Sequence, residues 1–198
     1  MHHLGHIFLA EETGGFQFGA FIADGIRGAK FQMLPLEVQR GIQFHRWVDW
    51  QTDRHPAFLQ ARQLMRPVAS RYAGLIVDLW LDVVLGQLWE KFSSEPLEAF
   101  EERFRAETLR PYRGWSPVSW DAFIQDLERK RLLLLFATPE GMLEHIRRFI
   151  YRRNLPLDSQ AVCRAIEGES EKLGEILSRF WQDAFDWRRR AATFIPNP

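Results

Sequence analysis

Cysteine is almost absent from this chain of 198 residues, and Cys163 is its one representative. A single cysteine excludes an internal disulfide and any zinc site built from several cysteines, and it suits a reducing compartment. No stretch reaches about 18 uncharged apolar residues, the length that a membrane-spanning helix needs. The opening residues also lack the basic segment and the apolar run of a secretory signal. We therefore expect a cytoplasmic protein.

The sequence has no excess of charge of either sign, because 26 Lys and Arg residues balance 26 Asp and Glu residues. With no overall field to attract them, we expect neither nucleic acid nor a membrane as the partner. Only four of the basic residues are lysines. Arginine binds phosphate and carboxylate groups bidentately, so local anion binding remains open, although genome composition and solvated helix faces explain the same bias.

Apolar residues recur at helical spacing along nearly the whole chain, and alternating strand patterns bounded by hairpin turns are missing. The pattern predicts helices that include residues 16–23, 36 to about 53, 72–89 and 117–136. We expect Pro67 to kink or end the helix that starts at Pro56. No repeat, low-complexity tract or linker divides the chain. The sequence therefore predicts an all-α fold in which residues 1–198 form a single helical bundle domain.

Two aspartates interrupt the apolar stretch of residues 72–89. Asp78 and Asp82 are four residues apart, so both carboxylates lie on one face of a helix that is otherwise apolar all round. An isolated carboxylate in a protein core is costly. The pair therefore needs an arginine partner, protonation or a metal ion, and this helix alone does not choose among them.

A second helix repeats this arrangement with His45 and Asp49. These residues are also four apart, and they continue the apolar line of Val38 and Ile42. Asp53 extends the line near the end of the helix. A lone inward histidine is usually a satisfied core residue, but its pairing with a carboxylate, opposite a second acidic helix, favours metal binding. We expect the two inward pairs to converge.

Two further candidates lie near the N-terminus. His6 belongs to an apolar opening segment, and Asp24 ends a short apolar helix before a glycine. Periodicity alone favours an ordinary turn aspartate and an ordinary core histidine at these positions. As ligands, mixed imidazole and carboxylate groups suit manganese, iron, zinc or magnesium and do not choose among these metals.

Four segments, taken in order, resemble the acyl carrier protein phosphodiesterase family, a divergent relative of the HD-domain metal-dependent phosphohydrolases. They are residues 4–10, 19–28, 41–56 and 71–82, and the third of them is the most specific. The resemblance covers nearly the whole chain. It implies a helical, HD-like fold and a catalytic divalent metal, with manganese as the expected ion.

The implied reaction is hydrolysis of the phosphodiester that joins 4′-phosphopantetheine to a serine of holo acyl carrier protein, which yields the apo carrier. On this resemblance the expected metal ligands are His6, His45, Asp49, Asp78 and Asp82. Asp24 is expected to be another ligand or the base that takes a proton from water. Arg27 and Arg46 are expected to neutralise phosphate charge, and Asp53 is grouped with them in the catalytic set.

Four positions depart from the family pattern. Val83 stands where the family has histidine, Ala20 and His2 stand where it has asparagine, and Gly25 stands where it has phenylalanine. Because valine cannot bind a metal, we expect weaker metal binding or slower hydrolysis than in relatives with the full pattern. Two alternatives therefore stay open: a related hydrolase of small phosphoesters, and a non-catalytic protein that only binds a carrier protein.

Overall fold

The computed structural model describes residues 2–11 and 13–191 of the chain. Within these residues every regular element is helical, which confirms the expected all-α fold. The α-helices are α1 (His3–Leu9), α2 (Gly15–Ile22), α3 (Leu36–Thr52), α4 (Pro56–Ala69), α5 (Ala73–Gln87), α6 (Trp89–Phe92), α7 (Leu97–Arg103), α8 (Arg110–Tyr112), α9 (Asp121–Lys130), α10 (Leu132–Phe136), α11 (Pro139–Arg152), α12 (Ser159–Gly168), α13 (Ser170–Phe185) and α14 (Arg188–Ala191). None of the helices in the described ranges is long and apolar enough to cross a membrane.

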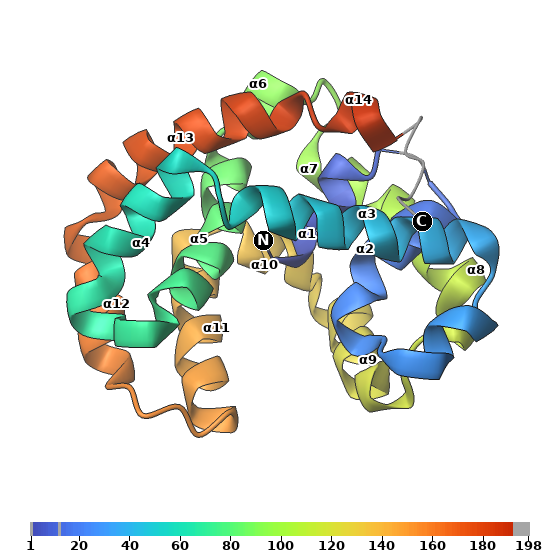
Figure 1. Ribbon diagram of the computed structural model, residues 1–198, viewed down its shortest axis with the longest axis horizontal. Coiled ribbons are helices and arrows are strands. Elements are labelled where there is room, and N and C mark those ends of the chain that lie inside the picture. Colours follow the sequence, from blue (N-terminus) through green and yellow to red (C-terminus); the bar gives the residue numbers. More distant parts are fainter. Residues whose placement is uncertain (1, 12, 192–198) are drawn as a thin grey trace.

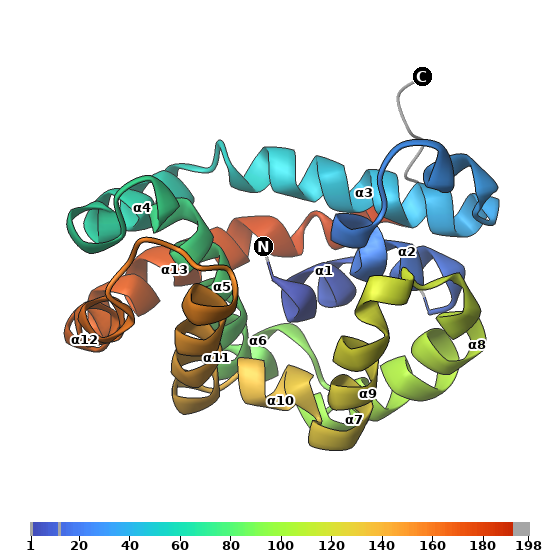
Figure 2. The same cartoon turned by 90° about the horizontal axis from the view of Figure 1, so that it is seen from below.

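Short 3-10 and π-helical segments link these helices. They are η1 (Ala23–Gly25), η2 (Gly28–Met33), η3 (Ser70–Tyr72), η4 (Phe104–Leu109), η5 (Arg113–Trp115) and η6 (Val118–Trp120). Figure 1 shows α4, α5, α11, α12 and α13 on one side of the molecule and α2, α8 and α9 on the other. The long helix α3 extends from one group to the other in Figure 1 and in the perpendicular view of Figure 2.

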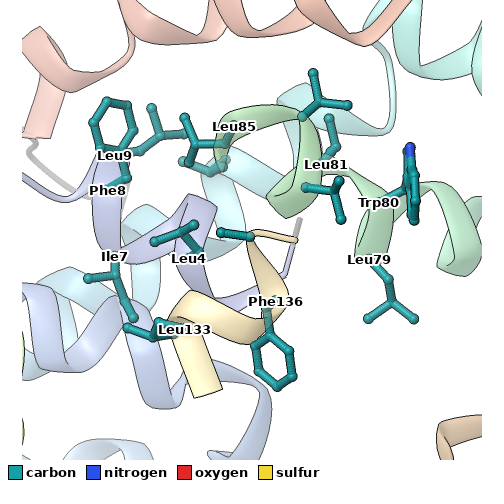
Figure 3. Packing of buried hydrophobic residues seen from close by; sticks show 14 of the residues in the cluster. Leu4, Ile7, Phe8, Leu9, Leu79, Trp80, Leu81, Leu85, Leu133 and Phe136 are labelled. Carbon is teal, nitrogen blue, oxygen red and sulfur yellow. The ribbon is translucent and has the colours of Figure 1, made fainter. Parts of the chain in front are cut away.

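The apolar core surrounds α1, in which every residue from Leu4 to Leu9 is buried. Figure 3 shows side chains of α1, α5 and α10 facing one another, with Leu4, Leu81 and Leu133 among them. Complete burial of such a leucine contributes about 1.5–3 kcal/mol relative to exposure. Apolar packing therefore sets the position of α1, and with it the position of His6.

The crossing of α2 over α3 is very close because glycines occupy the contact. A Cβ atom added to Gly19 would lie 2.1 Å from the carbonyl oxygen of Val38, and one added to Gly41 would lie 1.9 Å from that of Phe16. Both obstacles are backbone atoms, which cannot rotate away as a side chain can. This crossing allows the backbone of α2 to reach the side chain of His45 on α3.

Helices α2, α3 and α5 lie where the sequence predicts them, to within two residues at each end. Helix α4 does not end at Pro67 but continues to Ala69, because a proline in the last turn removes only one backbone hydrogen bond. Another expectation is wrong. Residues 117–136 do not form one helix. Arg131 adopts a left-handed conformation with φ of 51°, which separates α9 from α10.

Candidate metal centre

Three potential metal ligands come together where side chains of α1 and α3 meet. They are His6 on α1 and the pair His45 and Asp49 on α3, whose ligand atoms all lie within 4.8 Å of one another. His6 Nε2 lies 3.1 Å from Asp49 Oδ1, and His45 Nε2 lies 3.1 Å from Asp49 Oδ2. The two imidazole rings stack with their centroids 3.6 Å apart. One carboxylate therefore faces two imidazoles.

The tautomer of His45 follows from its partner on α2. His45 Nδ1 lies 2.7 Å from the carbonyl oxygen of Ala20, which can only accept a hydrogen bond, so Nδ1 carries a proton and donates it. The other nitrogen, Nε2, then faces the carboxylates of Asp49 and Asp24, the latter at 3.4 Å. Metal-binding histidines commonly have this arrangement, with one nitrogen held by a carbonyl and the other free for the ion. Because the partner is a backbone atom, alanine in place of asparagine at position 20 leaves the bond intact.

The unsatisfied nitrogens of this group fit a cation. His6 and His45 are 2% and 3% exposed. Within the described chain, both nitrogens of His6 and Nε2 of His45 lack a hydrogen bond of good geometry, which is rare for buried polar atoms. Two ligand atoms on one ion, each about 2.1 Å from it, lie about 3.0 Å apart at right angles and about 3.4 Å apart at tetrahedral angles. The spacings of 3.1, 3.1 and 3.4 Å match that range, so these residues suit a divalent metal.

Burial and neighbouring charges shift the two imidazoles in opposite directions. Burial lowers the pKa of His6 to about 4, with a further contribution from His45, so His6 is neutral at pH 7 and ready to bind a metal. Burial also acts to lower the pKa of His45, but its contacts with Asp24 and Asp49 outweigh burial and raise it to about 9. A metal must therefore displace a proton from His45 before Nε2 can bind it.

The pKa values of the two carboxylates, Asp24 and Asp49, are both shifted downward. The contact with His45 is the largest cause that holds the pKa of Asp24 below its usual range. Burial acts to raise the pKa of Asp49, but the two imidazoles outweigh it and the net shift is downward. Both carboxylates are therefore ionised at neutral pH, as metal ligands must be.

Asp24 and Arg27 lie at the solvent side of this group. Asp24 belongs to η1 and its side chain is 67% exposed, yet its Oδ1 reaches His45. Arg27 is exposed and precedes η2. The structure therefore brings Asp24 to the predicted site, and it places Arg27 three residues further on, at the surface.

Arg46 and Asp53 lie on α3 and at its end, and both are exposed. Arg46 Nη2 donates to the carbonyl of Ile26 over 3.4 Å, and its guanidinium lies 5.4 Å from the centre of the Phe31 ring. Asp53 caps the C-terminal end of α3 on the solvent side rather than extending the inward line. The expectation that Asp53 points inward is wrong, because one more helical turn carries the chain beyond the edge of the core.

Asp82 binds backbone N–H groups of α1, whereas metal ligation was expected. It is completely buried, and it accepts hydrogen bonds from the backbone N–H groups of Leu4 (2.9 Å) and Gly5 (3.0 Å) at the start of α1. His2 Nδ1 lies 3.1 Å from its Oδ2. Asp82 is outside the three-residue group of His6, His45 and Asp49, and its oxygens are directed at the backbone of α1.

Asp82 nevertheless supports the site, because α1 carries His6. Its carboxylate satisfies two of the N–H groups that the first turn of α1 leaves without partners in the helix. Burial raises the pKa of this carboxyl to about 6, although the two backbone hydrogen bonds act against the increase. Asp78 lies half-buried one turn earlier on α5, and it also falls outside the three-residue group.

Three histidines gather on the side of Asp82, and no sequence pattern singled out His145. The ring of His2 lies 4.3 Å from that of His3 and 5.2 Å from that of His145 on α11. Nε2 of His145 is buried without a hydrogen-bond partner in the described chain. Burial is the largest cause that lowers the pKa of all three. The one available signal was the position of His145 beside Ile146 in an inward stripe.

Two departures from the family pattern have structural consequences. A Cβ atom on Gly25 would lie 2.7 Å from Cγ of Pro117 and 2.8 Å from Nε1 of Trp120, so a phenylalanine has no room here unless η6 moves. Val83 is 0% exposed within the core and offers no ligand atom. Neither Gly25 nor Val83 contributes a ligand atom to the group in which His6, His45 and Asp49 come together.

Comparison with known proteins identifies the family of the chain. An acyl carrier protein phosphodiesterase of Photorhabdus laumondii is 30% identical over 183 residues, which cover 92% of this chain and 90% of the relative. Acyl carrier protein phosphodiesterases of an Enterobacter species and of Salmonella agona are 35% and 34% identical over 101 residues, which cover 50% of this chain and 52% of each relative. No solved structure matches. The sequence model of one family matches residues 1–184, and the chain therefore belongs to the acyl carrier protein phosphodiesterase family.

Proposed function

We propose that this protein is a metal-dependent phosphodiester hydrolase that releases 4′-phosphopantetheine from holo acyl carrier protein and leaves the apo form. One observation carries the proposal: buried imidazole nitrogens of His6 and His45 face the carboxylate of Asp49 without satisfying hydrogen bonds, in a chain of this family. A purely structural ion pair needs only one imidazole per carboxylate. A second buried imidazole beside it is costly unless it binds something.

His6, His45 and Asp49 would hold the ion through two imidazoles and one carboxylate. We propose manganese, while magnesium, iron and zinc remain compatible with this donor set. When bound, a divalent ion lowers the pKa of its water and stabilises charge on phosphoryl oxygens. The chain supplies the orientation of the ligands: Ala20 fixes the tautomer of His45, and α1 fixes His6 through its packing.

The remaining residues are proposed to act around this ion. Asp24 reaches His45 from the solvent side, and its low pKa makes it a better ligand or orienting group than a base. Arg27 and Arg46 are proposed to neutralise phosphate charge at the surface of the site. For Asp82 we propose a positioning role through α1 in place of metal ligation. Asp78 and Asp53 receive no role in this scheme.

The experiment that tests this proposal combines metal analysis with mass spectrometry of the carrier. Metal-free protein is loaded with Mn²⁺ and incubated with holo acyl carrier protein, and the expected product is the apo carrier together with free 4′-phosphopantetheine. A chelator and the double variant His6→Gln, His45→Gln should each abolish the conversion. Conversion that persists in the double variant would contradict the assignment of the site.

The other outcomes separate the alternatives. Hydrolysis of small phosphodiesters with no conversion of the carrier would indicate a related phosphohydrolase. Binding of the carrier without any hydrolysis would indicate a non-catalytic member of the family, and Val83 would then be the residue in the sequence that points to the loss of activity.

We also propose that the chain acts as one domain, because α3 contributes to both groups of helices around the site.

A further inference from the structure

The surface segment η2 lies beside the site, and all of its residues except the partly buried Phe31, which packs against the core, are exposed. Segment η2 contains no buried residue. Met33 at its end is 76% exposed, and Leu36 at the start of α3 is 78% exposed. Lone exposed apolar residues are ordinary, but two large ones three residues apart, at the end of a mostly exposed segment and the start of α3, form a compact apolar feature.

The same segment is locally basic in a chain without net charge. Residues 25–47 contain four basic residues and one acidic residue, Glu37. Glu37 accepts a hydrogen bond from the hydroxyl of Tyr112 at 2.7 Å. Arg27 and Lys30 are exposed, and among the residues that the structure describes neither has a carboxylate partner. The surface therefore offers free positive charge next to apolar side chains.

Contacts from Asp24 and Arg46 connect this surface to the metal centre. Arg27 follows Asp24 by three residues, and Asp24 contacts His45. Arg46, the residue after His45, donates to the backbone of Ile26 and lies over the ring of Phe31 in η2. These contacts hold η2 against α3 beside the ligands, so a macromolecule bound on η2 has its own surface close to the metal centre.

We infer that Arg27, Lys30, Met33 and Leu36, here called the η2 face, form the docking surface for the acidic face of the carrier protein. The inference rests on the proposed function, which makes a protein the substrate. Charge complementarity selects a partner whose surface combines carboxylates with apolar side chains, and the unpaired cations would speed its encounter. Nucleic acid fits less well, because it offers no apolar side chains to Met33 and Leu36.

The test uses variants of the full chain that leave the metal centre intact. Lys30→Glu, Met33→Glu and the double variant change exposed side chains outside the ligand set. Matched controls are Lys172→Glu on α13 and Tyr151→Glu on α11, where Tyr151 is 87% exposed. Both lie in the group of helices away from η2 in Figures 1 and 2. Affinity for Mn²⁺ and the circular dichroism spectrum should stay unchanged in all variants.

The measurements are binding of the apo carrier by calorimetry and turnover of the holo carrier. Each η2 variant should weaken carrier binding and kcat/KM about tenfold, with kcat at saturation unchanged, whereas the controls should match wild type. The loss for Lys30→Glu should shrink as salt rises, because salt screens exposed charges.

The outcomes distinguish the docking surface from the proposed function. If wild type hydrolyses holo carrier and the η2 variants bind and turn over equally well, the docking inference is wrong while the function stands. If wild type only binds the apo carrier, and the η2 variants weaken that binding, the docking inference holds while the function fails. If wild type neither binds nor hydrolyses the carrier, both are overturned.

Discussion

Metal binding at the His6 group should be linked to the release of one proton, and pH is the perturbation that reveals it. In the metal-free protein the pKa of His45 is raised to about 9, so this imidazole is protonated at pH 7. Its Nδ1 proton is committed to the carbonyl of Ala20, which means that the proton to be displaced is the one on Nε2. The pKa of His6 is about 4, so His6 releases no proton in this range.

The size of the effect on metal affinity follows from the difference between the pH and the pKa of His45. Each unit below the pKa of His45 costs about 1.4 kcal/mol of binding free energy, or a factor of about ten in the dissociation constant. At pH 7 the cost is therefore about 3 kcal/mol relative to high pH. Between pH 6 and pH 8 the dissociation constant for Mn²⁺ should fall about a hundredfold.

Titration calorimetry of metal-free protein with Mn²⁺ provides the assay. Measurements at pH 6, 7 and 8, each in two buffers of different ionisation enthalpy, give both the dissociation constant and the number of protons released. The variant His45→Gln is the control, since it has no imidazole proton to lose and should show a much flatter pH dependence. A wild-type constant that changes by less than about threefold over this range, with no proton released, would show that His45 does not bind the ion.

Three substitutions test other parts of the structure. Asp82→Asn points an amide N–H₂ at backbone donors of α1, so the free energy of unfolding measured in urea should fall by about 1–3 kcal/mol. Mn²⁺ binding should also weaken, because α1 carries His6. Unchanged stability would contradict the capping role. Gly41→Ala forces a Cβ atom to within 1.9 Å of the Phe16 carbonyl oxygen, so loss of Mn²⁺ binding and a large fall in melting temperature are expected. Val83→His restores the family's imidazole and should tighten Mn²⁺ binding or speed carrier hydrolysis. If wild type is already fully active and this variant gains neither, position 83 is not a defect of the site.

The inward pair on α3 was predictable because its signal is local. His45 and Asp49 share a face with Val38 and Ile42, and the spacing of four residues places them there in any helix. The structure confirms that His45 is buried and that Asp49 contacts it. The same reasoning gave a wrong prediction for Asp53, which is exposed. Periodicity shows which face of a helix a residue shares but not where the core ends along that face.

Asp82 shows a different limit of local reasoning. Its burial was evident from the apolar residues around it, and an arginine, a proton or a metal ion were the expected means of compensation. The structure provides another: backbone N–H groups at the start of α1, far away in the sequence. The sequence shows that a buried carboxylate needs hydrogen-bond donors, but only the packing of another element determines which donors contact it.

The sequence by itself determined that the chain is helical and that two helices carry inward polar pairs, because both properties depend on residues a few positions apart. Only the tertiary structure decided that His6 lies against His45, that Asp82 caps α1 and that His145 approaches His2. These contacts join segments whose relative positions depend on core packing and on the glycine crossing of α2 and α3. The candidate metal centre is therefore a product of long-range packing, which side-chain periodicity does not encode.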